Sequence, residues 1–572
     1  MTRRRRLPRS LFAGVLGAEV ATWWAVSPSL LPRPWWVTAA NVAICQGVGH
    51  VVATGLSFSV SRTFDRFGRR PHYLITVASM QLTHATLAAI TTAAIALSLR
   101  RQPEQARLVD LGGRRGARHA LIGGVVGTAG YGALLLLGDA AQVSVDRLGA
   151  RLSRYMPIWV SWPLAAGLVG YLAALLSDRV LVRRTLHTLS RNAAELNRSV
   201  FPGTMMPWEP ERSGSPWSYE AWSSVGAQGR AVLALGPRAR DITDVTGLAE
   251  VHEPIRIFAG LVPGRSLAAS ARRVLAEMDR TGAFRRDTIV IQTSAGTGWI
   301  TDWSVCAYEF LTGGNCATVS MQYSYLPSAV SYVMDRDSPI LASRELIEAV
   351  LGRIDQMPAD DRPKVYVAGE SLGGYGIAAS FDDLDDLLTR TDGAVFSGSP
   401  RFTRLVRELT AARDAGTPER LPVVDGGRHV RFVAHPDHLR RNHSGVNYPH
   451  RWRHPRVVIA QHASDPIVWW NLRLVWQRPD WLTEPGSRGV RAPRGQRLDV
   501  VHGMRWVPFI TAWQVGLDQL TSLHVPGGHG HNYHDEMLWY WDAVLGDHAA
   551  VRMTDEIASR AREFIVTDSV RR

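Results

Sequence analysis

The sequence predicts two unlike halves: an all-α bundle of four or five membrane-spanning helices, then an α/β domain with a mostly parallel sheet flanked by helices. Three observations support this prediction. Long apolar stretches recur over residues 1–200, a segment rich in Pro, Gly, Ser and Trp follows at 201–222, and beyond residue 230 short β-branched runs alternate with longer amphipathic segments. We therefore expect a helical domain over 1–200, a linker over 201–229 and a catalytic α/β domain over 230–572.

Five stretches are apolar enough to cross a bilayer, which takes about 20 residues of helix. They are residues 11–31, 37–58, 74–97, 121–141 and 157–180. The arginines at 3–6 favour a cytoplasmic N-terminus. A cleaved signal peptide is the alternative, but no small-residue cleavage site is obvious and further apolar stretches follow.

The side of the membrane on which the α/β domain lies depends on the number of spans. Five spans place it outside and four place it inside, and basic loops follow both the second and the third stretch. We expect an integral, multi-pass plasma-membrane protein with an extracytoplasmic α/β domain.

Charge and cysteine content limit the class of protein. The 572 residues carry 65 Lys and Arg against 51 Asp and Glu, a net charge of +14, and only 3 cysteines. A basic excess usually suggests nucleic acid, but Lys364 is the only lysine, and much of the arginine flanks the apolar stretches. We expect a lipid bilayer as partner, no nucleic acid, no cofactor and no metal; the oligomeric state stays open.

Eight strands are expected in the α/β domain. They are residues 255–261, 288–293, 318–323, 365–368, 393–397, 430–434, 456–460 and 522–525. Helices are expected over 267–281 and 344–356 and from 377 onward. Strands that alternate with helices in this way indicate βαβ units and a parallel sheet.

The sequence Gly-Glu-Ser-Leu-Gly at 369–373 follows one of these strands and precedes a small-residue helix. In G-x-S-x-G motifs a sharp strand-to-helix turn holds the serine in a strained conformation and exposes its hydroxyl at the edge of the sheet. We predict Ser371 as a nucleophile; the alternative is a structural serine in a tight turn.

A nucleophilic serine needs a base and an orienting carboxylate, which in this architecture follow in the order Ser, Asp or Glu, His. Asp465 follows the strand at 456–460, and His529 and His531 lie in a Gly-rich loop after the strand expected at 522–525. Asp465 before Pro466 is also a good helix N-cap. His531 is the first candidate for the base and His529 the alternative, with His534 a weaker third.

The oxyanion donors are expected to be backbone N–H groups at two places. One is Leu372, directly after the serine; the other is the loop Ser294, Ala295, Gly296 after the strand at 288–293. A Gly-rich loop can also cradle phosphate, but this one lacks the lysine of the P-loop motif.

Four segments resemble a known family. They are Ser-Pro-Ser-Leu-Leu-Pro-Arg at 27–33, Gln-Tyr-Ser-Tyr-Leu-Pro-Ser at 322–328, the motif at 369–373 and Gly-His-Gly-His at 528–531. The second half resembles the α/β-hydrolase superfamily, and the whole chain is similar to the actinobacterial membrane-anchored α/β-hydrolase family. The resemblance implies a Ser-Asp-His hydrolase and leaves the substrate open.

Three other groups of residues carry alternatives. The histidines between 429 and 462 follow no metal-ligand spacing, so we interpret them as a polar insertion over the rim of the site. Trp469, Trp470, Trp476 and Trp481 fit a core or a lid over a lipid chain equally well. Cys306 and Cys316 could form a disulfide on an oxidising side of the membrane.

These observations favour a membrane-anchored serine hydrolase acting on an amphipathic or lipid-linked ester. Two alternatives stay open: an acyltransferase with the same triad, and a non-catalytic membrane scaffold or transport component with a hydrolase-like domain.

Overall fold

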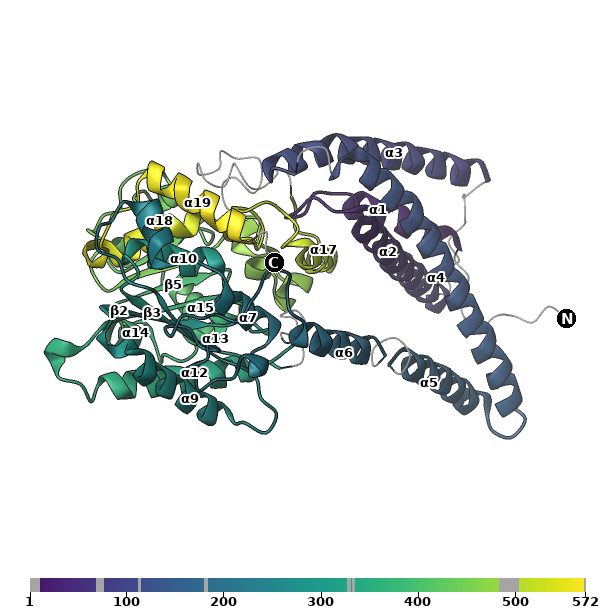
Figure 1. The fold of residues 1–572 in the computed structure, drawn as a ribbon. Helices are drawn as coiled ribbons and strands as arrows, with labels where there is room; N and C mark the ends of the chain where they lie inside the picture. The colour runs from purple at the N-terminus through teal and green to yellow at the C-terminus, as the bar shows by residue number, and fades with distance from the viewer. Residues whose placement is uncertain are drawn as a thin grey trace.

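The computed structural model describes residues 11–67, 77–111, 115–178, 184–326, 331, 335–482 and 504–569. Figure 1 shows a group of long helices beside an α/β domain, with α5 and α6 returning the chain from the far end of α4. The helices of the first half are α1 (Leu11–Ala25), α2 (Trp35–Arg66), α3 (Val77–Leu108), α4 (Ala117–Leu152), α5 (Ile158–Leu176) and α6 (Arg184–Arg198).

Close packing in the helical domain depends on glycine. α2 packs against both α1 and α4. A Cβ on Gly123 would lie 2.4 Å from Thr38 Cβ, and one on Gly127 would lie 2.7 Å from the Ala39 carbonyl. These two glycines of α4 therefore let its backbone approach α2 at a distance that no other residue permits.

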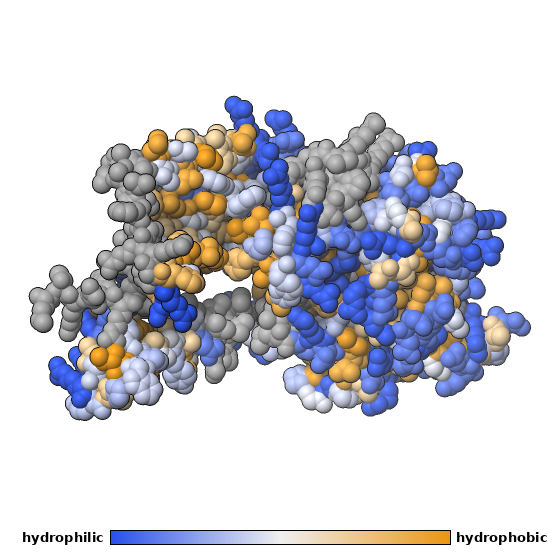
Figure 2. All heavy atoms as spheres, turned by 180° about the vertical axis from the view of Figure 1, so that it is seen from behind, coloured by the Kyte–Doolittle hydropathy of each residue, from blue (hydrophilic) through white to orange (hydrophobic). Residues whose placement is uncertain are grey.

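Among the described residues, three helices are long and apolar enough to cross a membrane: Trp35–Phe64, Ala117–Leu152 and Ile158–Leu176. Their outward side chains are exposed, and Figure 2 shows hydrophobic residues gathered over the helical domain and a mostly hydrophilic α/β surface. The first predicted stretch is shorter than expected, because α1 ends at Ala25 and is about 22 Å long at 1.5 Å per residue. Residues 74–76 and 179–180 of two predicted stretches lie outside the described part.

A seven-stranded sheet forms the α/β domain, with every neighbouring pair parallel and the order β1-β3-β2-β4-β5-β7-β6. The strands are β1 (Ile255–Ala259), β2 (Thr288–Thr293), β3 (Cys316–Met321), β4 (Lys364–Glu370), β5 (Gly393–Ser397), β6 (Val430–Val433) and β7 (Arg456–Ala460). The expected class, a mostly parallel sheet flanked by helices, is confirmed.

Helices cover both faces of the sheet. One face carries α9 (Leu267–Thr281), α12 (Ser338–Ile354), α13 (Leu372–Ala378), α14 (Leu384–Arg390) and α15 (Arg404–Ala411). The other carries α8 (Ala239–Thr246), α10 (Asp302–Leu311), α18 (Glu536–Leu545) and α19 (Asp555–Ser569). Ile289 and Ile291 point into the first core and Val290 into the second, so the strands read as continuous apolar runs.

The strand expected at 522–525 is wrong. Ser522 follows the short 3-10 helix Gln519–Thr521, and its N–H and hydroxyl both donate to the Gln519 carbonyl. Val525 packs against Leu31 and Val109 of the helical domain instead of joining the sheet. The β-branched residue thus finds its apolar partners at the domain junction, and the Pro and glycines after it turn the chain.

The segment between the two halves is anchored to the α/β domain. Arg212 is fully buried and forms an isolated parallel bridge with Arg256 of β1. Its guanidinium donates to the Leu233, Leu235 and Pro237 carbonyls around α7 (Ala227–Ala234). Much of the expected linker therefore lies against the sheet edge.

The two halves meet where the loop at 27–33, here called the SPSLLPR loop, packs on α17 (Ile510–Asp518). The fully buried Asp518 carboxylate accepts hydrogen bonds from Ser29 Oγ at 3.0 Å and from the N–H groups of Leu30 at 3.0 Å and Leu31 at 3.3 Å. Arg33, also buried, lies 3.8 Å from Asp518 and donates to the Ala25 and Ser27 carbonyls. One carboxylate thus fixes the path of the whole loop.

The apolar side chains of this loop reach into the α/β half. Leu30 joins a core with Trp469, the last residue of the short helix α16 (Pro466–Trp469) that follows β7, and with Trp481 further along the chain. Leu31 packs on Val525. The helical half therefore contributes directly to the packing around the carboxyl edge of the sheet.

We predict that Asp518→Ala destabilises the full-length protein by about 3–5 kcal/mol, because it leaves the buried Arg33 charge without a counter-charge. Thermal unfolding of the detergent-solubilised protein measures this as a lowered Tm. Asp360→Ala removes an exposed aspartate and is the control. Equal melting of the two variants would show that the buried pair contributes nothing to stability.

Candidate active site

Ser371 lies at the turn between β4 and α13. Its backbone has φ 57° and ψ −122°, a region that a residue with a Cβ rarely adopts. The turn is held by the Ser371 N–H, which donates to the Ser397 carbonyl at the end of β5 at 2.9 Å. A Cβ on Gly369 would lie 2.5 Å from the Gly373 backbone, and one on Gly373 would lie 2.5 Å from the Thr293 carbonyl. The two glycines of the motif thus let the turn close against β2.

Asp465 and His531 form a buried pair. Their Oδ2 and Nδ1 atoms are 2.8 Å apart, and the two side chains are 0% and 4% exposed. Asp465 also caps α16, because its Oδ1 accepts from the Ile467 N–H at 2.9 Å. The two functions predicted as alternatives for this carboxylate are therefore compatible: one oxygen caps the helix and the other faces the imidazole.

Tyr533 is a further partner that the sequence did not reveal. Its hydroxyl donates to Asp465 Oδ2 at 2.9 Å, the same oxygen that faces His531. Two donors on one oxygen fix the position of the carboxylate and, through it, the plane of the imidazole ring.

The other ring nitrogen of His531, Nε2, is buried and makes no hydrogen bond with any described residue. Burial lowers the pKa of His531, but the charge and hydrogen bond of Asp465, together with the charge of Glu370, raise it above its ordinary value overall. The ring lies over Gly398, where a Cβ would be 2.5 Å from His531 Cε1. Since Gly398 follows Ser397, which holds the Ser371 turn, the imidazole lies beside the nucleophile loop.

Glu370 is a buried carboxyl group directly before Ser371. Its Oε2 accepts from Thr301 Oγ1 at 2.6 Å and from Ser397 Oγ at 3.3 Å. Burial raises its pKa to about 7, against the opposing charge of His531 and these hydrogen bonds. Two acids therefore act on one imidazole, Asp465 through a hydrogen bond and Glu370 through its charge.

His462 supports the pair from behind. Its ring stacks on Tyr533 with centroids 4.1 Å apart, its Nδ1 lies 2.9 Å from the Gly530 carbonyl and its Nε2 lies 3.0 Å from Glu536 Oε1. This histidine belongs to the segment interpreted as a polar rim, yet it is 1% exposed. Its position three residues before Asp465 is the one sequence signal that could have distinguished His462 from the exposed histidines of that segment.

The structure places His529 away from Asp465, at the junction with the helical half. Its Nε2 lies 3.4 Å from Asp110 Oδ2 in the chain after α3. Both residues line a polar cavity of about 560 Å³ that also includes Arg107 and Asp535. Of the two candidate bases, His531 is the one that faces the carboxylate.

The expected oxyanion donors lie in two neighbouring elements, the start of α13 and the loop after β2. Leu372 is the first residue of α13, where backbone N–H groups have no acceptor within the helix. The loop with Ser294 and Gly296 lies beside it, because Thr293 Oγ1 donates to the Gly373 carbonyl at 2.7 Å. The Ala295 N–H, however, donates to the Trp299 carbonyl at 2.8 Å, so it is committed to a turn.

The structure also places the tryptophans, the cysteines and the possible metal ligands that the sequence pointed to. Trp469 and Trp481 are buried in the core, whereas Trp476 is 62% exposed. The cysteines, including Cys306 and Cys316, are free. Within the described residues, no group of three or more His, Cys, Asp or Glu side chains is arranged to hold a metal ion.

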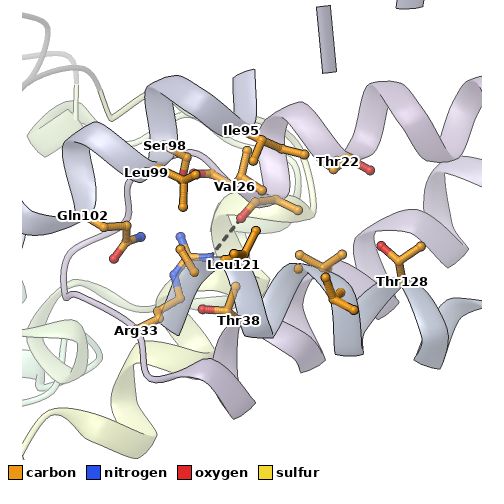
Figure 3. A pocket seen from close by; sticks show the side chains of 15 residues that line it. Thr22, Val26, Arg33, Thr38, Ile95, Ser98, Leu99, Gln102, Leu121 and Thr128 are labelled. Atoms are coloured by element: carbon orange, nitrogen blue, oxygen red, sulfur yellow. Dashed lines mark hydrogen bonds between the residues drawn. The ribbon is translucent and has the colours of Figure 1, made fainter. Parts of the chain in front are cut away.

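An apolar cavity of about 340 Å³ lies in the helical half next to the SPSLLPR loop (Figure 3). Side chains of α1, α2, α3 and α4 line it; Figure 3 shows Arg33 and Gln102 toward one end and Thr22 and Thr128 toward the other. The Arg33 guanidinium there donates to the Ala25 carbonyl at 3.0 Å. The lining is thus mostly apolar, with a few polar side chains.

Family comparisons agree with this geometry. A family model described as "Alpha/beta-hydrolase family" matches residues 255–558, more than half of the chain. The chain belongs to the alpha/beta-hydrolase family. A second model, "Alpha/beta-hydrolase family N-terminus", matches residues 26–237, which include the whole SPSLLPR loop and all of α2 to α6.

No curated protein and no solved structure matches the chain. The alpha/beta-hydrolase assignment therefore rests on the two family models and on the sheet, with the Ser371 turn at its carboxyl edge.

We predict that Gly398→Ala lowers hydrolase activity by about 100-fold, because its methyl group displaces the His531 ring and small misplacements of reacting groups are costly. The matched control is Gly416→Ala. Both glycines have positive φ, 57° and 80°, so both variants should lose about 1–2 kcal/mol of stability, but nothing lies within 4 Å of a Cβ at 416. Activity assays of the two variants, at a temperature where both are folded, separate displacement of the His531 ring from backbone strain. Equal activities of the two variants would contradict the proposed displacement of the ring.

Proposed function

We propose that this alpha/beta-hydrolase is a membrane-anchored serine hydrolase that cleaves an ester of an amphipathic or lipid-linked substrate. The buried pair of Asp465 and His531 beside the strained Ser371 turn carries the proposal. A free, buried Nε2 on an imidazole whose Nδ1 is held by a carboxylate is what a general base for a serine requires.

In the first half of the reaction, Ser371 Oγ attacks the ester carbonyl carbon while His531 Nε2 takes its proton. The Leu372 N–H and a backbone N–H of Ser294 or Gly296 stabilise the tetrahedral oxyanion. The carbon–oxygen bond to the alcohol then breaks, the imidazolium returns its proton to the leaving alcohol, and the acyl group stays on Ser371.

In the second half, water enters and gives its proton to His531 as its oxygen attacks the acyl-enzyme. Collapse of the second tetrahedral intermediate releases the carboxylic acid and restores the Ser371 hydroxyl with the same proton. Asp465 stays ionised throughout and stabilises the imidazolium through its hydrogen bond. An alcohol in place of water would make the same residues an acyltransferase.

The membrane part of the proposal rests on the three long apolar helices and their exposed side chains. We place them across the plasma membrane as a multi-pass anchor, with the catalytic domain on the extracytoplasmic side. The mostly apolar cavity at the SPSLLPR loop, with the polar side chains of Arg33 and Gln102 in its lining, favours a substrate that has both a polar and an apolar part.

We predict that Ser371→Ala abolishes labelling by a fluorophosphonate probe and lowers hydrolysis of p-nitrophenyl butyrate by at least about 1,000-fold. Ser380→Ala, in which a buried serine just beyond α13 is removed, is the control and should label like the wild type. Labelling that persists in Ser371→Ala would refute Ser371 as nucleophile, and a wild type that neither labels nor hydrolyses would favour a non-catalytic scaffold.

We also predict an acidic limb of kcat/KM with a midpoint above about 6.5, the ordinary histidine value, because the neighbouring acids raise the pKa of His531. Glu370→Gln should move this midpoint to lower pH, since loss of the negative charge disfavours the imidazolium. The exposed Glu345→Gln serves as the control. A pH profile of Glu370→Gln that moves to higher pH, or does not move, would contradict this electrostatic coupling.

A further inference from the structure

A third cavity, of about 590 Å³, lies at the carboxyl edge of the sheet. One wall is formed by Arg401 and Phe402 in the loop after β5, and another by the segment Asn471–Trp481 that follows α16. The first wall begins four residues after Ser397, whose carbonyl holds the Ser371 N–H. The second begins six residues after Asp465. In parallel α/β sheets ligands bind at this edge.

The cavity also touches the nucleophile helix through an aromatic contact. The ring of Phe402 packs edge-on against Tyr375 of α13, with centroids 4.7 Å apart. The Tyr375 N–H donates to the Ser371 carbonyl in the first turn of that helix. A molecule bound in the cavity can therefore contact Phe402, which packs on the helix that follows Ser371.

The lining of the cavity carries a net positive charge. The lining residues include four arginines, at 401, 407, 473 and 478, and two carboxylates, Glu419 and Asp480. Both carboxylates are engaged, Glu419 with Arg401 and with the Trp481 N–H, and Asp480 with Arg413.

Arg407, Arg473 and Arg478 are exposed, and among the described residues no carboxylate lies within 4.0 Å of any of the three. Their guanidinium groups around one cavity create a positive potential that an anion would neutralise.

Apolar side chains lie beside these arginines. Leu472 and Trp476 are each 62% exposed on the same short segment as Arg473. Val475 of that segment accepts a hydrogen bond from the Phe509 N–H, at the start of α17, which packs on α1 and α2. Exposed Trp and Leu next to Arg, close to a membrane domain, are typical of a surface in the lipid headgroup region.

We propose that this cavity, here called the arginine pocket, binds the phosphate of a lipid headgroup, so that the ester presented to Ser371 belongs to a phosphate-bearing membrane lipid. This proposal rests on the proposed hydrolase function and specifies its substrate class. Guanidinium groups bind phosphate oxygens through paired hydrogen bonds. Asn471 Oδ1 is buried in the lining, has no hydrogen bond with any described residue and can accept one from a headgroup hydroxyl.

The test compares two short-chain lipids that differ in the phosphoglycerol group: dihexanoylphosphatidylglycerol and dihexanoylglycerol. We measure hexanoate release by the full-length protein in neutral detergent micelles. The wild type should prefer the phosphate-bearing lipid in kcat/KM by at least tenfold, and Arg407→Gln/Arg473→Gln should reduce this preference at least tenfold. The charge-matched control, Arg440→Gln/Arg441→Gln, changes two exposed arginines outside the pocket and should keep the preference.

Inorganic phosphate and glycerol 3-phosphate, added as inhibitors, distinguish a lipid from a soluble source. Weak competition with retained lipid preference supports a lipid headgroup, whereas strong competition without lipid preference overturns it. Equal hydrolysis of the two lipids by the wild type would also overturn the proposal while leaving the hydrolase function intact.

A binding measurement keeps the two proposals separable. In Ser371→Ala, tryptophan fluorescence is titrated with dihexanoylphosphatidylglycerol, with and without Arg407→Gln/Arg473→Gln. Tighter binding when both arginines are present supports the arginine pocket even if the wild type hydrolyses no ester, a result that would refute only the hydrolase function. Equal binding with and without the arginines refutes the pocket.

Discussion

The buried carboxylate of Asp518 is the constraint on which the relation of the two halves depends. It accepts from Ser29 and from two successive backbone N–H groups of the SPSLLPR loop, and Arg33 balances its charge. Burial raises the pKa of Asp518 to about 6, although Arg33 and the hydrogen bonds oppose the shift. A buried ion pair contributes little net stability, but it restricts the geometry of its surroundings, because any other arrangement leaves a buried charge without a partner. We infer that its value here is to fix one docking position of the helical half on the α/β half.

That docking position reaches the candidate active site through a short path. From Asp518 the chain passes through one 3-10 turn and the Gly-rich loop to His531. A Cβ on Gly530 would lie 2.7 Å from Val525 Cγ2 and 3.6 Å from Leu31 Cδ1. The residue before the candidate base therefore lies close to Leu31, a side chain of the helical half.

The sequence predicts those parts of the site that local rules determine. Continuous apolar runs locate seven strands, the glycine spacing locates the Ser371 turn, and the chain order of an α/β-hydrolase selects Asp465. The choice between His529 and His531 is not local, because both lie in one loop and only the direction of each side chain separates them. Tyr533, His462 and Glu370 are missed for a related reason: their partners come from other strands and loops, and a buried tyrosine or glutamate has the same local sequence signal as an exposed one.

The surroundings of His531 explain why an enclosed site needs both halves. The imidazole faces one carboxylate through a hydrogen bond and a second through space, and neither Asp465 nor Glu370 is accessible to water. Charges interact more strongly in such a site than in water, so an imidazolium formed at His531 is stabilised only as long as water stays out. Trp469 and Trp481 close the region behind Asp465, and Leu30 of the SPSLLPR loop completes their core. A helical half that served only as an anchor would not need to place a leucine there. Its loop acts as part of the wall of the α/β domain, which couples the position of the helical half to the surroundings of the candidate base.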